Sequence, residues 1–110
     1  MNAALENEVV QLHAEICAGL ADPNRILILY ELSQSPRNVT EISTNLKMPQ
    51  PLVSRHLKVL RERGMVWPER HGTVIEYRLS DHRLIEALDL LRAVLRDVLS
   101  KRANLAGVIG

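Results

Sequence analysis

Apolar residues recur at helical spacing near the start of the chain and again near its end. Residues 4–20 carry one such stripe, and residues 81–102 carry a second, broader one. The stripes consist of Leu5, Val9, Leu12, Ile16 and Leu20 in the first segment, and of Leu84, Leu88, Leu91, Leu95 and Val98 in the second. Both segments are therefore predicted to be amphipathic helices.

A central helix is predicted from Pro23 to about Gln34. Asp22 suits the N-cap position, and proline is favoured in the first helical turn because no amide hydrogen is needed there. Apolar side chains cover most of the circumference of this segment, which is typical of a helix surrounded by other elements.

Two helices joined by a short turn are predicted in residues 38–64. Thr40 can cap the first helix, and the second begins near Gln50 and ends at Gly64, which suits a left-handed C-terminal position. The core face of the second helix consists of Leu52, Val53, Leu57 and Leu60. This arrangement is the helix-turn-helix, in which the second helix enters the major groove of DNA.

Residues 65–79 change to the pattern of β-strands. Two β-prone runs flank the tripeptide at residues 71–73 and predict a hairpin, or wing. The chain is thus expected to be one domain over residues 1–110, mainly α within the α+β class, with a winged helix-turn-helix fold.

A core of this size cannot cover the stripes of the first and last helices as well. We therefore expect a homodimer formed through residues 4–20 and 81–102. The expected interface residues are Leu5, Val9, Leu12, Ile16, Leu84, Leu88, Leu91 and Leu95.

The charge is unevenly distributed, although the net charge is only +1. Residues 1–46 hold two arginines against six acids, whereas residues 47–78 hold seven basic residues against three acids. A polyanion is therefore expected to meet the middle of the chain. The aromatic content of 3% argues against binding to RNA or single strands, which needs stacking platforms.

The predicted second helix of the helix-turn-helix carries polar residues off its core face. Arg55 could read guanine and Gln50 adenine, Ser54 could accept a base or a phosphate, and phosphate contacts are assigned to His56 and Lys58. The expected DNA-binding residues are Gln50, Ser54, Arg55, His56, Lys58 and Arg61 on the helix, with Arg70, His71 and Thr73 on the wing. The alternative for both segments is a solvated surface without a nucleic-acid partner.

Three strings resemble the ArsR/SmtB family of repressors. They are LADPNRILILYEL for the central helix, PQPLVSRHLKVLRERGMV for the DNA-reading helix and its exit, and EYRLSD at the end of the wing. The resemblance covers roughly residues 12 to 98, and VSRHLKVL followed by Gly64 is its most specific part. It implies a homodimeric repressor that binds a palindromic double-stranded operator, with an inducer in many members.

The metal-sensing sites of that family are incomplete in this sequence. The last helix opens with Asp81, His82 and Arg83, but no histidine follows near Val94 or Asp97. The short helix TEISTNLK also lacks the Cys-x-Cys pair of thiolate-sensing relatives. His82 and Glu86 alone would leave metal coordination incomplete, so no metal and no cofactor are expected.

His13 and Cys17 leave one alternative open, a metal- or thiol-responsive sensor, because residues four apart lie on one side of a helix. A winged-helix protein-interaction module without DNA affinity is another. An enzyme is not expected, since the chain lacks a Gly-rich phosphate loop and a nucleophile with an adjacent base. The single cysteine and the acidic N-terminal segment, which resembles neither a signal peptide nor a membrane span, favour the cytoplasm.

Overall fold

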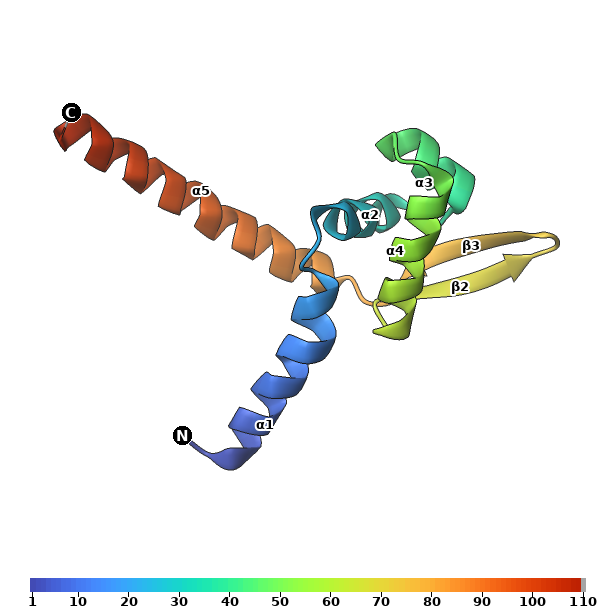
Figure 1. Cartoon of the computed structure of the whole chain (residues 1–110), viewed down its shortest axis with the longest axis horizontal. Helices are drawn as coiled ribbons and strands as arrows, with labels where there is room; N and C mark the ends of the chain where they lie inside the picture. The colour runs from blue at the N-terminus through green and yellow to red at the C-terminus, as the bar shows by residue number, and fades with distance from the viewer. Residues whose placement is uncertain (110) are drawn as a thin grey trace.

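The computed structural model describes the backbone of residues 1–109 and the side chains of residues 1–107. Helices dominate, and a β-hairpin projects from the body on the side opposite to the C-terminal helix (Figure 1). The elements in chain order are α1 (Ala3–Leu12), the π-helical segment η1 (His13–Cys17), α2 (Pro23–Gln34), β1 (Arg37–Asn38), α3 (Val39–Leu46), α4 (Gln50–Glu62), β2 (Val66–His71), β3 (Val74–Leu79) and α5 (Arg83–Ile109). The predicted winged helix-turn-helix fold is confirmed.

Short polar contacts define where the helices begin. The Asp22 carboxylate accepts a hydrogen bond of 2.8 Å from the amide of Asn24 at the start of α2, as expected of an N-cap. At α3 the predicted cap at Thr40 is wrong. Asn38 occupies that position and forms a reciprocal capping box with Glu41, because its side chain can reach the third amide of the helix.

Two residues with positive φ angles redirect the chain on either side of α4. Lys47 adopts the left-handed conformation with φ of 55° between α3 and α4. Gly64 has φ of 70° two residues after the end of α4 at Glu62, where the absence of a Cβ makes this conformation inexpensive. The backbone conformation of Lys47 therefore sets the angle between α3 and α4, and that of Gly64 sets the direction in which the chain leaves α4 toward the wing.

The core lies where α2, α3, α4 and the base of the hairpin meet. Its fully buried side chains are Ile28, Leu29, Ile42, Val53, Leu57, Leu60, Met65 and Val66. Leu27 on α2 is 48% exposed, so the central helix is enclosed on most sides but not all. The branched aliphatic core replaces the aromatic residues that the composition lacks.

The wing belongs to a three-stranded antiparallel sheet in the order β1-β3-β2. β1 pairs Arg37 with Tyr77 and Asn38 with Glu76, a contact that the sequence pattern did not predict. This short strand ties the base of the wing to the segment that leads into α3.

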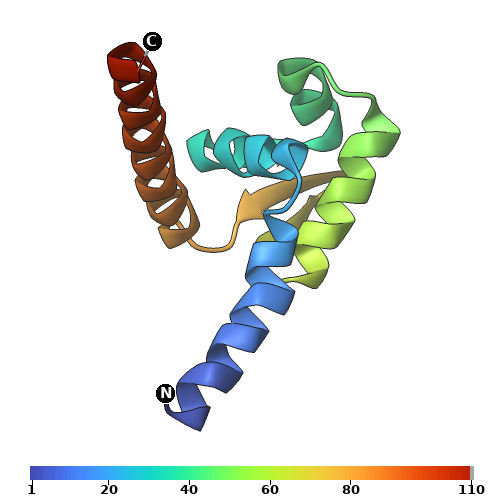
Figure 2. The same cartoon turned by 60° about the vertical axis from the view of Figure 1, so that its left-hand side comes forward.

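The first and last helices diverge from the body (Figures 1 and 2). No side chain of α1 is buried, and α5 runs on to Ile109 rather than ending near residue 102. The expected dimer interface is wrong at Leu88. This side chain is only 5% exposed and belongs to the core of its own chain. The first turns of α5 pack on the core, and the helix leaves it at Leu91.

Candidate nucleic-acid interface

The outer face of α4 collects most of the residues predicted to contact DNA. Gln50, Ser54, Arg55, Lys58 and Arg61 are all exposed, while Val53, Leu57 and Leu60 on the opposite face are buried. Within residues 1–109, no ion pair involves Arg55, Lys58 or Arg61. These three cations are therefore available to an external anion.

Thr40 is a polar neighbour of this face that sequence reasoning assigned only to a helix cap. The Gln50 side-chain amide donates a hydrogen bond of 3.4 Å to the Thr40 hydroxyl oxygen. Both residues are exposed, one in the first turn of α3 and the other at the start of α4. This contact uses one donor of the Gln50 amide and leaves its carbonyl oxygen available to an external donor.

The expected phosphate contact at His56 is wrong. The His56 side chain lies inside the protein with 7% exposure, and its Nδ1 is 3.4 Å from an Arg25 guanidinium nitrogen. His56 follows Val53 by three residues and precedes Leu60 by four, so all three lie on the core face of α4. The spacing alone could have predicted that His56 is buried, but histidine is a polar residue and was therefore assigned to the exposed face.

Arg25 is a structural residue that the sequence did not single out. Its Nε donates to the carbonyl oxygen of Gly19 at 2.7 Å, and its Nη2 donates to that of Ala18 at 3.1 Å. Through its contact with His56, Arg25 links the segment before α2 to α4. Arg25 therefore contacts α4 on its buried face and helps to fix the position of this helix.

The wing presents different chemistry on its two faces. His71 Nε2 lies 3.3 Å from a Glu76 carboxylate oxygen and 3.9 Å from one of Glu69, and Arg78 lies 3.5 Å from the other Glu69 oxygen. Paired strand positions share a face, so these acids partly neutralise Arg78 and lie beside the His71 ring. Arg70 points to the opposite face, and Thr73 is exposed at the tip.

His13 and Cys17, the candidate sensing pair, are both exposed in η1. Among the described residues there is no group of three or more His, Cys, Asp or Glu side chains that could hold a metal ion. His82 and Glu86 are likewise exposed at the start of α5. The structure thus places two ligand types near each other in η1 without assembling a coordination shell around them.

An exposed ion pair marks the start of α5. The Arg83 guanidinium donates to both Asp81 carboxylate oxygens, with one contact of 2.7 Å, and the Arg83 amide also donates to this carboxylate. These hydrogen bonds lower the pKa of Asp81 from 3.8 to about 2, so the carboxyl stays ionised beside the cation.

No helix within the described residues is long and apolar enough to cross a membrane.

Comparison with known proteins gives a consistent result. The sequence model described as bacterial regulatory protein, arsR family, matches residues 22–67, which contain α2 to α4. The HTH-type transcriptional regulator NmtR of Mycobacterium tuberculosis is 35% identical over 88 residues, which cover 80% of this chain and 73% of NmtR. The HTH-type transcriptional repressor SmtB of the same species is 46% identical over 77 residues, or 70% of this chain. That match spans only 57% of the length of SmtB.

A solved structure has the same fold. It is the homodimeric winged helix-turn-helix DNA-binding domain Mb0332 from Mycobacterium bovis, described as a possible ArsR-family transcriptional regulator. The TM-score is 0.75 at 27% sequence identity, with 90% of this chain and 91% of that chain covered. The agreement extends beyond the helix-turn-helix to the wing and the terminal helices, because so much of both chains is included.

Proposed function

This chain belongs to the arsR family of bacterial regulatory proteins, and from that premise we propose that it is a homodimeric transcriptional repressor that binds a palindromic operator in double-stranded DNA. The name of SmtB as a transcriptional repressor supports repression rather than activation. A repressor of this kind acts by occupying a promoter in the cytoplasm, and it needs no catalytic step.

The observation that carries the proposal is the exposed polar face of α4. Arg55 has the length and the paired donors to contact O6 and N7 of guanine, and Gln50, oriented by Thr40, offers its carbonyl oxygen to an exocyclic amine. Lys58 and Arg61 lie further along the same helix and are assigned to phosphates, with Arg70 and Thr73 of the wing as lesser contacts. The buried His56 takes no part.

The dimer is inferred from the two diverging helices. The radius of gyration is 17.3 Å, whereas a compact domain of this length has about 13 Å. Large exposed apolar side chains extend along both helices and include Leu5, Val9 and Leu12 of α1 and Leu91, Val94, Leu95 and Leu99 of α5. A second copy of the chain would cover them, and the homodimeric state of Mb0332 supports this assignment.

Two copies related by a two-fold axis would present two α4 helices to one face of the DNA. Each would read one half-site, with the half-site centres about 10 base pairs apart or a multiple of that distance. The proposal therefore includes a symmetric operator.

In-vitro selection from a pool of random duplexes tests the proposal. The wild type is expected to enrich an inverted repeat, and Arg55→Ala is expected to lose about 1–3 kcal/mol of affinity for it, because a bidentate guanine contact disappears. Lys101→Ala removes an equal charge far from α4 and serves as the matched control. Equal losses of Arg55→Ala on the selected and random duplexes would reject base reading, and absence of any enriched sequence would reject the repressor.

A further inference from the structure

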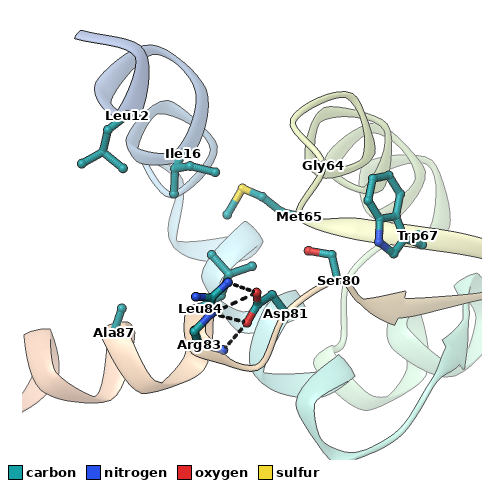
Figure 3. A pocket seen from close by; sticks show the side chains of 10 residues that line it. All are labelled: Leu12, Ile16, Gly64, Met65, Trp67, Ser80, Asp81, Arg83, Leu84 and Ala87. Carbon is teal, nitrogen blue, oxygen red and sulfur yellow. Dashed lines mark hydrogen bonds and ion pairs between the residues drawn. The ribbon is translucent and has the colours of Figure 1, made fainter. Parts of the chain in front are cut away.

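Apolar packing does little to fix the direction in which the first helix leaves the body. The structure describes every residue of α1 and η1, and none of their side chains is buried. Ile16 of η1 packs against the core, as does Leu20 just beyond it. Figure 3 shows Ile16 and Met65 lying toward each other, between η1 and the turn that follows α4. Such contacts are non-directional, so they alone would let α1 pivot about its attachment.

Directional contacts come from Arg63, which caps the C-terminal end of α4. Its guanidinium Nη1 donates to the carbonyl oxygens of Ala14 and Glu15 in η1, the second at 3.3 Å. The stem of Arg63 lies against Gly19, since a Cβ at this glycine would be 3.1 Å from the Arg63 Cδ and 2.7 Å from the Met65 Sδ. One side chain of α4 is thus bound to the backbone of the first helical segment.

A second arginine binds the same segment. Arg25 of α2 donates to the carbonyl oxygens of Ala18 and Gly19, and it also contacts His56 in α4. Arginines suit the C-terminal end of a helix, because the last carbonyls lack partners within the helix and carry partial negative charge. The end of the first helical segment is therefore linked to the middle of α4 through Arg25 and to the end of α4 through Arg63.

The two arginines differ in burial. The Arg63 side chain is 30% exposed, against 15% for Arg25, and its carbonyl partners lie at the surface. Removing the Arg63 guanidinium is therefore expected to free the direction of α1 without disturbing the core.

We propose that Arg63 is a positioning residue for DNA recognition, which fixes the direction of α1 relative to α4 and thereby the separation of the two α4 helices in the dimer. This inference rests on the proposed function, in which α1 contributes to the subunit interface and each α4 reads one half-site. Each base pair added between the half-sites moves one of them by about 3.4 Å and rotates it by roughly 35°. A dimer with firmly attached α1 helices therefore accepts one spacer length, whereas loosely attached helices accept several.

Duplexes that carry the selected inverted repeat, with the spacer varied one base pair at a time, test this role. The wild type is expected to prefer one spacer over its neighbours by at least about tenfold, and Arg63→Met, which keeps the stem but loses the donors, by less than about threefold. Both should bind a duplex with a single half-site equally well, because Arg63 acts through geometry. Weaker binding of Arg63→Met to the single half-site, with the spacer preference retained, would indicate a phosphate contact and overturn the inference.

Glu15→Gln is the matched control. The Glu15 carboxylate is 3.9 Å from the Arg63 Nη1 and 63% exposed, so removing its charge leaves the carbonyl contacts intact and should not alter the spacer preference. Arg63→Lys keeps a cationic donor near these carbonyls and should retain part of the preference. Arg63→Gln, whose shorter side chain cannot reach η1, replaces Arg63→Met if circular dichroism shows that the latter is unfolded.

A measurement without DNA separates this role from the proposed function. Cys17 is the only cysteine of the chain, so a Cys17→Ser, Ser54→Cys variant carries one spin label on the exposed face of α4. Pulsed electron paramagnetic resonance then gives the distance between the two α4 helices of a dimer. One narrow distance is expected in this background, and a broader distribution once Arg63→Met is added.

Identical distance distributions with and without Arg63→Met, or an identical spacer preference, would overturn the positioning role while the repressor itself stands. The absence of any distance between subunits, or of any enriched inverted repeat in the wild type, would count against the proposed function instead.

Discussion

Replacing Arg25 with methionine is expected to destabilise the protein more than any other single arginine substitution outside the DNA-binding face. The variant keeps the apolar stem of the side chain and removes the guanidinium, which bonds to Gly19 O at 2.7 Å, to Ala18 O at 3.1 Å and to His56 Nδ1 at 3.4 Å. The side chain is only 15% exposed, so water replaces few of these bonds. His56 would also lose its one polar neighbour.

The magnitude follows from the two shorter contacts. A hydrogen bond from a charged donor contributes about 1.5–3 kcal/mol, and the long contact to His56 adds little. Two such bonds at the lower end of this range contribute about 3 kcal/mol, so the free energy of unfolding is expected to fall by about that amount. For a domain of this size the melting temperature would fall by roughly 12 °C.

Urea unfolding followed by circular dichroism measures this loss, with all variants at one protein concentration because assembly makes stability concentration-dependent. Arg83→Met is the control. Arg83 binds Asp81 at 2.7 Å, but its side chain is 83% exposed, so no measurable loss of stability is expected. A loss of less than about 1 kcal/mol in Arg25→Met, or equal losses in the two variants, would refute the burial argument.

Three further outcomes are expected. Leu95→Glu should dissociate the dimer while the subunit stays folded, as seen by sedimentation and circular dichroism. Leu88→Glu should instead unfold the chain, because Leu88 lies in the core. Dissociation without unfolding in both variants would contradict this difference between Leu88 and Leu95. Thr40→Val should relax base preference at the position read by Gln50 and leave affinity for random duplexes unchanged, and an unaltered selected motif would remove Thr40 from recognition. Operator affinity should be indifferent to chelator and to added zinc, and a tight signal of one zinc per subunit that vanishes in Cys17→Ala would identify a sensor instead.

Local patterns in the sequence predicted most of the architecture. Apolar periodicity located the helices, and Asp22, Lys47 and Gly64 mark boundaries that depend on neighbouring residues alone. β1 escaped prediction because a strand of two residues has no periodicity of its own and exists only through its pairing with β3. The end of α5 was predicted too early, since the apolar stripe that indicated this helix ends at Val98 whereas the helix continues to Ile109.

The candidate site was predicted less completely, because burial depends on which elements pack together. The exposure of Arg55 followed from its angle on α4, and the burial of His56 could have followed from the same angle. The roles of Arg25 and Thr40 could not be predicted, since each acts on a residue at least ten positions away through a contact that only the tertiary fold creates. Leu88 differs from Leu95 for the same reason, as the core ends between them.

Lys58 and Arg61 on the exposed face of α4 are expected to face DNA phosphates. The most direct test is the dissociation constant of the wild type for its selected duplex, measured by anisotropy between 50 and 200 mM salt. Two phosphate contacts per subunit, from Lys58 and Arg61, predict a log–log slope of about −3.6 and a loss of affinity of roughly 150-fold over this range, because condensed counterions are released on binding. Lys58→Gln should lower the slope by about one contact per subunit. A salt-independent dissociation constant would exclude these phosphate contacts and indicate a protein-interaction module instead.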